Sequence, residues 1–469
     1  SNPALNNKFY DVLLMNTENP IKERFCRVLY PLDRTLNIKN HLHTVEGIET
    51  HYDTYKEFIW KNMNVPALLT EDSLPLGYNP YSLVYLSELS TWTEVRDEFI
   101  PLYQLPEETN TILDEHLVKL TEHLETTEEK ILRLIRFTQD EIRYLGIEMG
   151  AGAFKPNPPE KVLMQRFGDC KDKTMLLISF LNKIGVKAYP VLVNTKLRES
   201  LIQYQPSAIM FNHAIVMLLY EDKYYWIDPT MSYQRGTLEH FYQPYYGYGL
   251  ILSNHFDELV EMHKESFEDG KVEINNVLDV SNDDKGVLTI TTKYISLEAD
   301  MKRQVIEEMS RQELARNYIN FLAQDFPTIQ PIGLDIKDDE LTNEILVTEQ
   351  YEIPNIWQWD DEYNFYEVLL IPNELYSNLK RPHFSIRSMP LRIKHPVDVK
   401  HNTEVLLHKQ RWNIESSTWK AEDPSMKFSR KILYHRNKLK IKYHYKSLSH
   451  RLEKEDVMNH VQNIFKARK

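Results

Sequence analysis

The stretch 166-RFGDCKDKT-174 holds one of only two cysteines in the 469-residue chain, at a point where a helix is expected to begin. Apolar residues recur at helical spacing over 175–181, and the pattern stops at Gly185. Asp169 is a residue type that caps helices, and Gly168 lets the backbone turn closely in front of it. The sequence therefore predicts Cys170 in the first turn of a helix.

A thiol in that position is favoured as a nucleophile. The first turn of a helix has unpaired N–H groups and the positive end of the helix dipole, which stabilise a thiolate. Lys171 and Lys173 add positive charge nearby. The alternative is a buried, inert thiol, and this is the expected role of Cys26, whose segment 25–30 alternates apolar and polar residues like a half-buried strand. Two distant cysteines exclude a disulfide framework, although a single bridge between them stays open.

A nucleophilic cysteine needs a base, and two later motifs supply one. The motif 211-FNHAIV-216 places His213 at the start of a predicted strand, and 226-WIDPT-230 places Asp228 where the next strand ends at a proline. Residues 221–223 read as the hairpin turn between them. Antiparallel neighbours would bring the two side chains together, so that the carboxylate could fix the tautomer of the imidazole. A structural histidine and a turn aspartate are the alternatives.

Taken together, these motifs resemble the transglutaminase-like core, whose superfamily has a papain-like arrangement. The segments 143-RYLGIE-148 and 154-FKP-156 narrow the resemblance to bacterial envelope proteins in which a β-rich domain of unknown function precedes the core. The resemblance is strong over about residues 125–232 and weaker over about 55–105. It implies Cys170 as nucleophile, His213 as base and Asp228 as orienting carboxylate, with no metal or organic cofactor. It also implies a periplasmic or cell-surface location.

Two departures from the family pattern bear on specificity. Ile215 stands where an aromatic residue is common, and the upstream tryptophan that often supplies an oxyanion donor has no clear equivalent. Tyr144 is the candidate for that role, beside the Cys170 N–H. Both departures put glutamine-specific crosslinking in doubt.

Three further residues are candidates for substrate binding. Asp172 and Lys173 follow the cysteine and could contact substrate or form a solvated helix face. Tyr246 belongs to the tyrosine-rich segment 242–248, which could line a groove or plug a loop.

The predicted fold class is α+β, with helices packed on an antiparallel sheet and β-rich domains on either side. We expect a truncated β-rich N-terminal domain at 1–107, a transglutaminase-like core at 108–265, and a β-rich C-terminal domain with helices at 266–469. A helix is expected near 297–323 and another near 455–465. The formal charge of −13 gives no reason to expect a nucleic-acid partner. The sequence contains no run of 18 or more apolar residues, so we expect no membrane span. We also find no signal-peptide pattern at the start of the given sequence.

The resulting functional hypothesis is cysteine-dependent acyl transfer or hydrolysis of an amide bond. The substrate would be a peptide, a protein or a peptidoglycan-like polymer. The alternative is a catalytically silent envelope module that binds a polysaccharide or protein partner through the tyrosine-rich groove and the β-rich domains. The sequence does not predict the oligomeric state.

Overall fold

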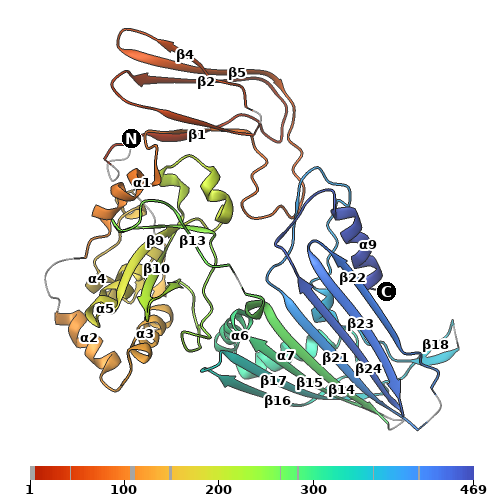
Figure 1. Cartoon of the computed structure of the whole chain (residues 1–469). Coiled ribbons are helices and arrows are strands. Elements are labelled where there is room, and N and C mark those ends of the chain that lie inside the picture. Colours follow the sequence, from red (N-terminus) through yellow and green to blue (C-terminus); the bar gives the residue numbers. More distant parts are fainter. Residues whose placement is uncertain are drawn as a thin grey trace. The chain divides into compact units, whose positions relative to one another are not determined.

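The chain mixes helices with large, mainly antiparallel sheets in a computed structural model (Figure 1). The structure describes residues 6–42, 44–105, 111–146, 150–264, 266–281, 285–362, 364–409 and 412–468. Contacts divide the chain into two compact units. Unit 1 comprises residues 1–71, 76–232 and 243–264, and unit 2 comprises 72–75, 233–242 and 265–469. The three domains expected from the sequence stay a prediction.

Unit 1 begins with two three-stranded sheets, in the orders β1-β6-β3 and β2-β5-β4. Their shared core is built around Trp60 and Phe58 of β5 with Val84 and Leu86 of β6. Cys26 lies half-buried on β2, against this core. The strands are β1 (Tyr10–Leu14), β2 (Ile21–Pro31), β3 (Asn37–His41), β4 (Ile48–His51), β5 (Tyr55–Val65) and β6 (Leu83–Ser87).

The helices of unit 1 follow these sheets along the chain. The predicted cap at Thr126 is confirmed, because its side chain accepts the N–H of Glu129 and that carboxylate returns to the Thr126 N–H. Every residue of α5 from Cys170 to Leu181 is buried, so its polar side chains need partners inside the protein. The helices are α1 (Trp92–Phe99), α2 (Thr111–Thr121), α3 (Thr127–Arg136), α4 (Pro159–Gln165) and α5 (Cys170–Lys183), with a π-helical turn at Phe137–Glu141.

Helix α5 packs against β9 and β10 of a five-stranded antiparallel sheet, in the order β11-β10-β9-β12-β13. The predicted hairpin is confirmed: Tyr220 pairs with Lys223, and the two residues between them, Glu221 and Asp222, both have positive φ, as a tight two-residue turn requires. The strands are β9 (Lys187–Val193), β10 (His213–Tyr220), β11 (Lys223–Ile227), β12 (Tyr248–Ile251) and β13 (Val260–Glu261).

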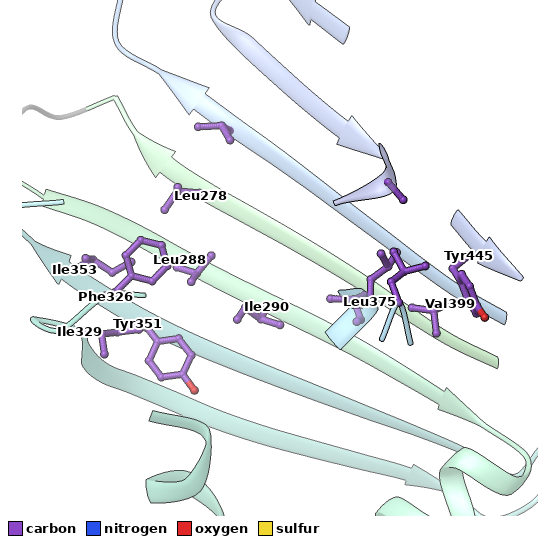
Figure 2. Packing of buried hydrophobic residues seen from close by; sticks show 14 of the residues in the cluster. Leu278, Leu288, Ile290, Phe326, Ile329, Tyr351, Ile353, Leu375, Val399 and Tyr445 are labelled. Carbon is purple, nitrogen blue, oxygen red and sulfur yellow. The ribbon is translucent and has the colours of Figure 1, made fainter. Parts of the chain in front are cut away.

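Unit 2 is built on an eight-stranded sheet in the order β16-β17-β15-β14-β21-β24-β23-β22. Its pairs are antiparallel except for β14 and β21, which run parallel. Figure 2 shows Leu278, Leu288 and Ile290 of the sheet in the hydrophobic core that also contains Phe326. The strands are β14 (Lys271–Val280), β15 (Lys285–Ile295), β16 (Gln330–Asp339), β17 (Glu344–Pro354), β21 (Asp398–Leu407), β22 (Ser417–Asp423), β23 (Met426–His435) and β24 (Lys438–Ser447).

The single helix expected near 297–323 is two helices, α6 (Leu297–Glu308) and α7 (Arg311–Leu322). The break is local, because the Ser310 hydroxyl accepts the N–H of Glu313 and caps a new helix there. The expected C-terminal helix is α9 (Val457–Ala467), and a short helix α8 (Asn373–Tyr376) follows β19 (Phe365–Glu367), which pairs with β18 (Gln358–Asp360). Within the described ranges, no helix is long and apolar enough to cross a bilayer.

Candidate active site

Cys170 is the first residue of α5, as the sequence predicts, and its position is fixed by a reciprocal cap. The Asp169 carboxylate accepts the N–H groups of Lys171 and Asp172, and the Asp172 carboxylate accepts the N–H of Asp169. Gly168 is needed just before it, since a Cβ there would lie 2.6 Å from the Cβ of Asp172. The Cys170 N–H is itself one of the first-turn donors that no helical carbonyl can accept.

His213 and Asp228 meet through the predicted hairpin. His213 is the first residue of β10, Asp228 directly follows β11, and the imidazole Nε2 lies 2.8 Å from Asp228 Oδ2. Since Nε2 faces the carboxylate, Nδ1 is the ring nitrogen available to Cys170, which borders the same cavity as this imidazole and raises its pKa. The structure thus brings together the three residues that the sequence singled out.

The charged forms of His213 and Asp228 stabilise each other. Burial by itself would lower the pKa of His213, but the nearby Asp228 carboxylate, with the hydrogen bonds of Asp228 and Cys170, raises that pKa to about 10. Burial would likewise raise the pKa of Asp228, yet the imidazole and its hydrogen bonds lower it. The Asp228 carboxylate therefore favours the protonated form of the His213 imidazole at neutral pH.

Asp228 is held by a second set of contacts. Its Oδ1 accepts the N–H and the hydroxyl of Thr230, at 2.8 and 2.7 Å. Its Oδ2 also accepts the Tyr246 hydroxyl at 2.7 Å, and the Tyr246 ring meets the His213 ring edge to face. The Gln139 side-chain amide donates to the Asp228 backbone carbonyl at 2.9 Å. Tyr246, predicted to contact substrate, lies where it can orient the carboxylate.

Asp172 and Lys173 are both buried, and neither lines the cavity at Cys170. Asp172 closes the helix cap and accepts the backbone N–H of Asn157. The Lys173 ammonium donates to the backbone carbonyls of Gln139 and Ile142, at 3.2 and 2.7 Å. Its burial lowers its pKa to about 8 despite the charges of Asp228 and Asp140. The structure thus places both side chains in packing roles.

Tyr144, the predicted oxyanion donor, lies on the short strand β7 (Arg143–Tyr144), which pairs with β8 (Phe167–Gly168) just before Cys170. Its side chain is 53% exposed and is not among the residues that line the cavity at the thiol. Tyr144 therefore lies on a strand beside the start of α5, but its side chain does not border this cavity. The backbone N–H of Cys170 is the oxyanion donor that its position supports.

A cavity of about 70 Å³ borders both Cys170 and His213. Four aromatic rings form part of its walls, beside polar side chains such as Lys171 and Asn212, and the sequence singled out none of these rings. They come from three segments, and Phe154 and Phe211 lie inside motifs quoted above. The rings are those of Phe99, Tyr103, Phe154 and Phe211.

Comparison with known proteins gives a structural likeness only. No protein-family model matches the chain, and no curated protein matches it. A crystal structure of a "putative protease" from Parabacteroides distasonis ATCC 8503 superposes with a TM-score of 0.62 at 12% identity, covering 98% of this chain and 72% of that one. A "putative cysteine protease" from Cytophaga hutchinsonii gives a TM-score of 0.23 at 14% identity, over 48% of this chain and 75% of that one, and this match is too weak to argue from. The chain therefore shares the fold of the first protein along nearly all of its length.

Proposed function

We propose that this chain is a cysteine hydrolase with a papain-like, transglutaminase-type core that cleaves an amide bond in a peptide or protein. The observation that carries the proposal is His213, which lies between the Asp228 carboxylate and the Cys170 thiol at the N-terminus of a buried helix. A nucleophile, a base and an orienting group in contact are the minimum that covalent acyl transfer requires.

The steps follow from these positions. The Cys170 thiolate attacks the carbonyl carbon of the amide, a C–S bond forms, and the carbonyl π electrons move to oxygen, where the Cys170 N–H can donate. The His213 imidazolium then gives its proton to the amide nitrogen as the C–N bond breaks and the amine leaves. Water attacks the thioester, His213 takes one water proton, and the C–S bond breaks to release the acid and restore the thiolate.

Hydrolysis is favoured over transfer to an amine by the fold comparison. A structure that shares this fold over 98% of this chain is described as a "putative protease", and a protease hydrolyses peptide bonds. The periplasmic or cell-surface location and a cell-wall substrate stay predictions that rest on the resemblance in the sequence.

The test is the pH dependence of Cys170 alkylation by iodoacetamide. It is made in a Cys26→Ser background, because Cys26 is half-exposed and would also react. We expect Cys170 to be alkylated at about pH 6 much faster than a free thiol, whose pKa of about 8.5 leaves it almost fully protonated there. His213→Ala should remove this advantage, whereas His255→Ala, at an exposed histidine of the same unit, should keep it.

A folded protein in which Cys170 is unreactive, or reacts equally with and without His213, would contradict the proposal. The binding-module hypothesis would then take its place.

A further inference from the structure

Four aromatic rings form one part of the lining of the cavity beside Cys170. The rings of Phe99 and Phe154 lie 6.1 Å apart between centroids, and Phe99 and Tyr103 lie 6.5 Å apart. Phe211 is held edge to face by Trp92 at 5.6 Å. Because each ring packs against another aromatic side chain, the walls are preformed and need little ordering when a ligand enters.

Each cationic side chain of the lining is already paired with a buried carboxylate: His213 with Asp228 and Lys171 with Asp169. Besides His213, the one charged side chain among the described lining residues is Lys171, whose ammonium lies 2.7 Å from Asp169 Oδ2. Both members of this ion pair are buried. A charged substrate group placed between these rings would lose its hydration and would have to compete with Asp228 and Asp169 for the two lining cations, which is costly.

We propose that this cavity binds a large apolar side chain, preferably aromatic, on the residue whose backbone carbonyl is attacked. The inference rests on the proposed function and adds a substrate class to it: peptides with phenylalanine, tyrosine, tryptophan or leucine on the acyl side of the cleaved bond. A glutamine side chain as acyl donor would reach the sulfur with its own carboxamide and leave the four rings unfilled. The site is thus built for a peptide bond rather than for crosslinking through glutamine.

The experiment compares peptidyl fluoromethyl ketones that share one reactive group and differ in the adjacent residue. Second-order rates of Cys170 inactivation are measured with the acetyl-phenylalanyl, acetyl-glutamyl and acetyl-lysyl reagents in the Cys26→Ser background. Burying an aromatic ring against apolar walls predicts a phenylalanyl rate at least about tenfold above the other two.

Two substitutions test the cavity itself. Phe154→Ala removes one wall and should cut the ratio of the phenylalanyl rate to the glutamyl rate by about tenfold. Phe154→Lys should raise the glutamyl rate above the phenylalanyl rate, since it adds an unpaired positive charge to the lining. Phe256→Ala is the matched control, because Phe256 belongs to the same unit but does not line the cavity, and it should keep the ratio.

The two experiments distinguish a wrong substrate class from a wrong proposed function. If Cys170 reacts with iodoacetamide at about pH 6 but shows no preference for the phenylalanyl reagent, the substrate class is wrong and the hydrolase proposal stands. An unchanged ratio in both Phe154 variants likewise overturns the cavity assignment. If Cys170 fails to react with iodoacetamide, the proposed function fails and this inference fails with it.

Discussion

Tyr246 and His213 both donate to Oδ2 of Asp228, at 2.7 and 2.8 Å. The tyrosine thus stabilises the carboxylate that holds the imidazolium, although it does not itself line the cavity. We expect Tyr246→Phe to cost about 1 kcal/mol of that stabilisation, the usual net value of one hydrogen bond. Cys170 alkylation at about pH 6 should then slow by about fivefold, and its pH profile should move toward that of a free thiol.

The matched control is Tyr245→Phe, which removes the hydroxyl of the neighbouring buried tyrosine. Tyr245 lies in a different environment, with the Arg198 guanidinium 5.0 Å from its ring centroid. A loss of reactivity of equal size in both variants, or a Tyr246→Phe profile that keeps its shape and only drops in amplitude, would point to general destabilisation.

At the residue scale, the sequence predicts those residues that carry a local signal. Asp169 and Cys170 stand at a helix start, His213 at a strand start, and Asp228 before a proline, and the structure brings the last three together. The aromatic cavity has no such signal, because its rings come from distant segments. The position of Lys173 could not be predicted for a related reason. Charged residues in the first turn of a helix usually face solvent, whereas α5 is buried from Cys170 to Leu181 and the Lys173 ammonium donates to a backbone carbonyl inside the protein.

At the scale of single elements, β21 carries a buried histidine, His401, whose Nε2 lies 3.4 Å from the Asn276 side-chain amide and 3.8 Å from the Glu374 carboxylate. His401 is 3% exposed, and burial lowers its pKa to about 4. Since an unfolded histidine has a pKa near 6.5, the unfolded chain binds more protons between these two values. The stability of this region should therefore be fully present above about pH 6.5 and fall as the pH drops toward 4, by about 3 kcal/mol in total.

Hydrogen exchange of peptides from β21 in the intact chain measures this directly. Protection should fall between about pH 6.5 and 4.5 after correction for the intrinsic exchange rate, and His401→Leu should remove most of the fall. His435→Leu is the control, because His435 is exposed at the end of β23. The interpretation is wrong if both variants keep the full pH dependence, since carboxylates elsewhere would then be its cause.

The elements themselves follow from the sequence more closely than their arrangement does. Alternating residues predict strands such as β24, and Gly185 correctly ends α5. The parallel pairing of β14 with β21 joins Asn276 to Thr403 across more than a hundred residues. Nothing near either residue signals this partner, because the register is set by which apolar faces the whole unit can bury.

At the scale of the whole chain, the two units do not divide at one point in the sequence. Residues 233–242 belong to unit 2, although the chain then returns to unit 1 for 243–264. This segment pairs with the loop after β16, where the N–H of Gly236 donates to the carbonyl of Glu340 at 2.9 Å. It also supplies the carbonyl of Tyr233 to the buried Arg303 guanidinium, at 3.0 Å. A boundary near residue 265 therefore leaves unit 2 without part of its own structure.

The consequence can be tested with two fragments, 266–469 and 233–469. In the shorter fragment, Asp300 loses two donors, the N–H of Arg235 and the side-chain amide of Gln234, and keeps only Arg303 of these three partners. The Asp300 carboxyl is buried, and this burial raises its pKa to about 7. Leaving buried polar groups unpaired costs about 1–3 kcal/mol each, so we expect the longer fragment to be more stable by at least about 3 kcal/mol in urea unfolding.

A third fragment with residues 233–242 scrambled controls for added length and should unfold like the short one. Equal midpoints for all three would mean that unit 2 is complete without this segment, and that the division of the chain at one point near residue 265 is the correct description.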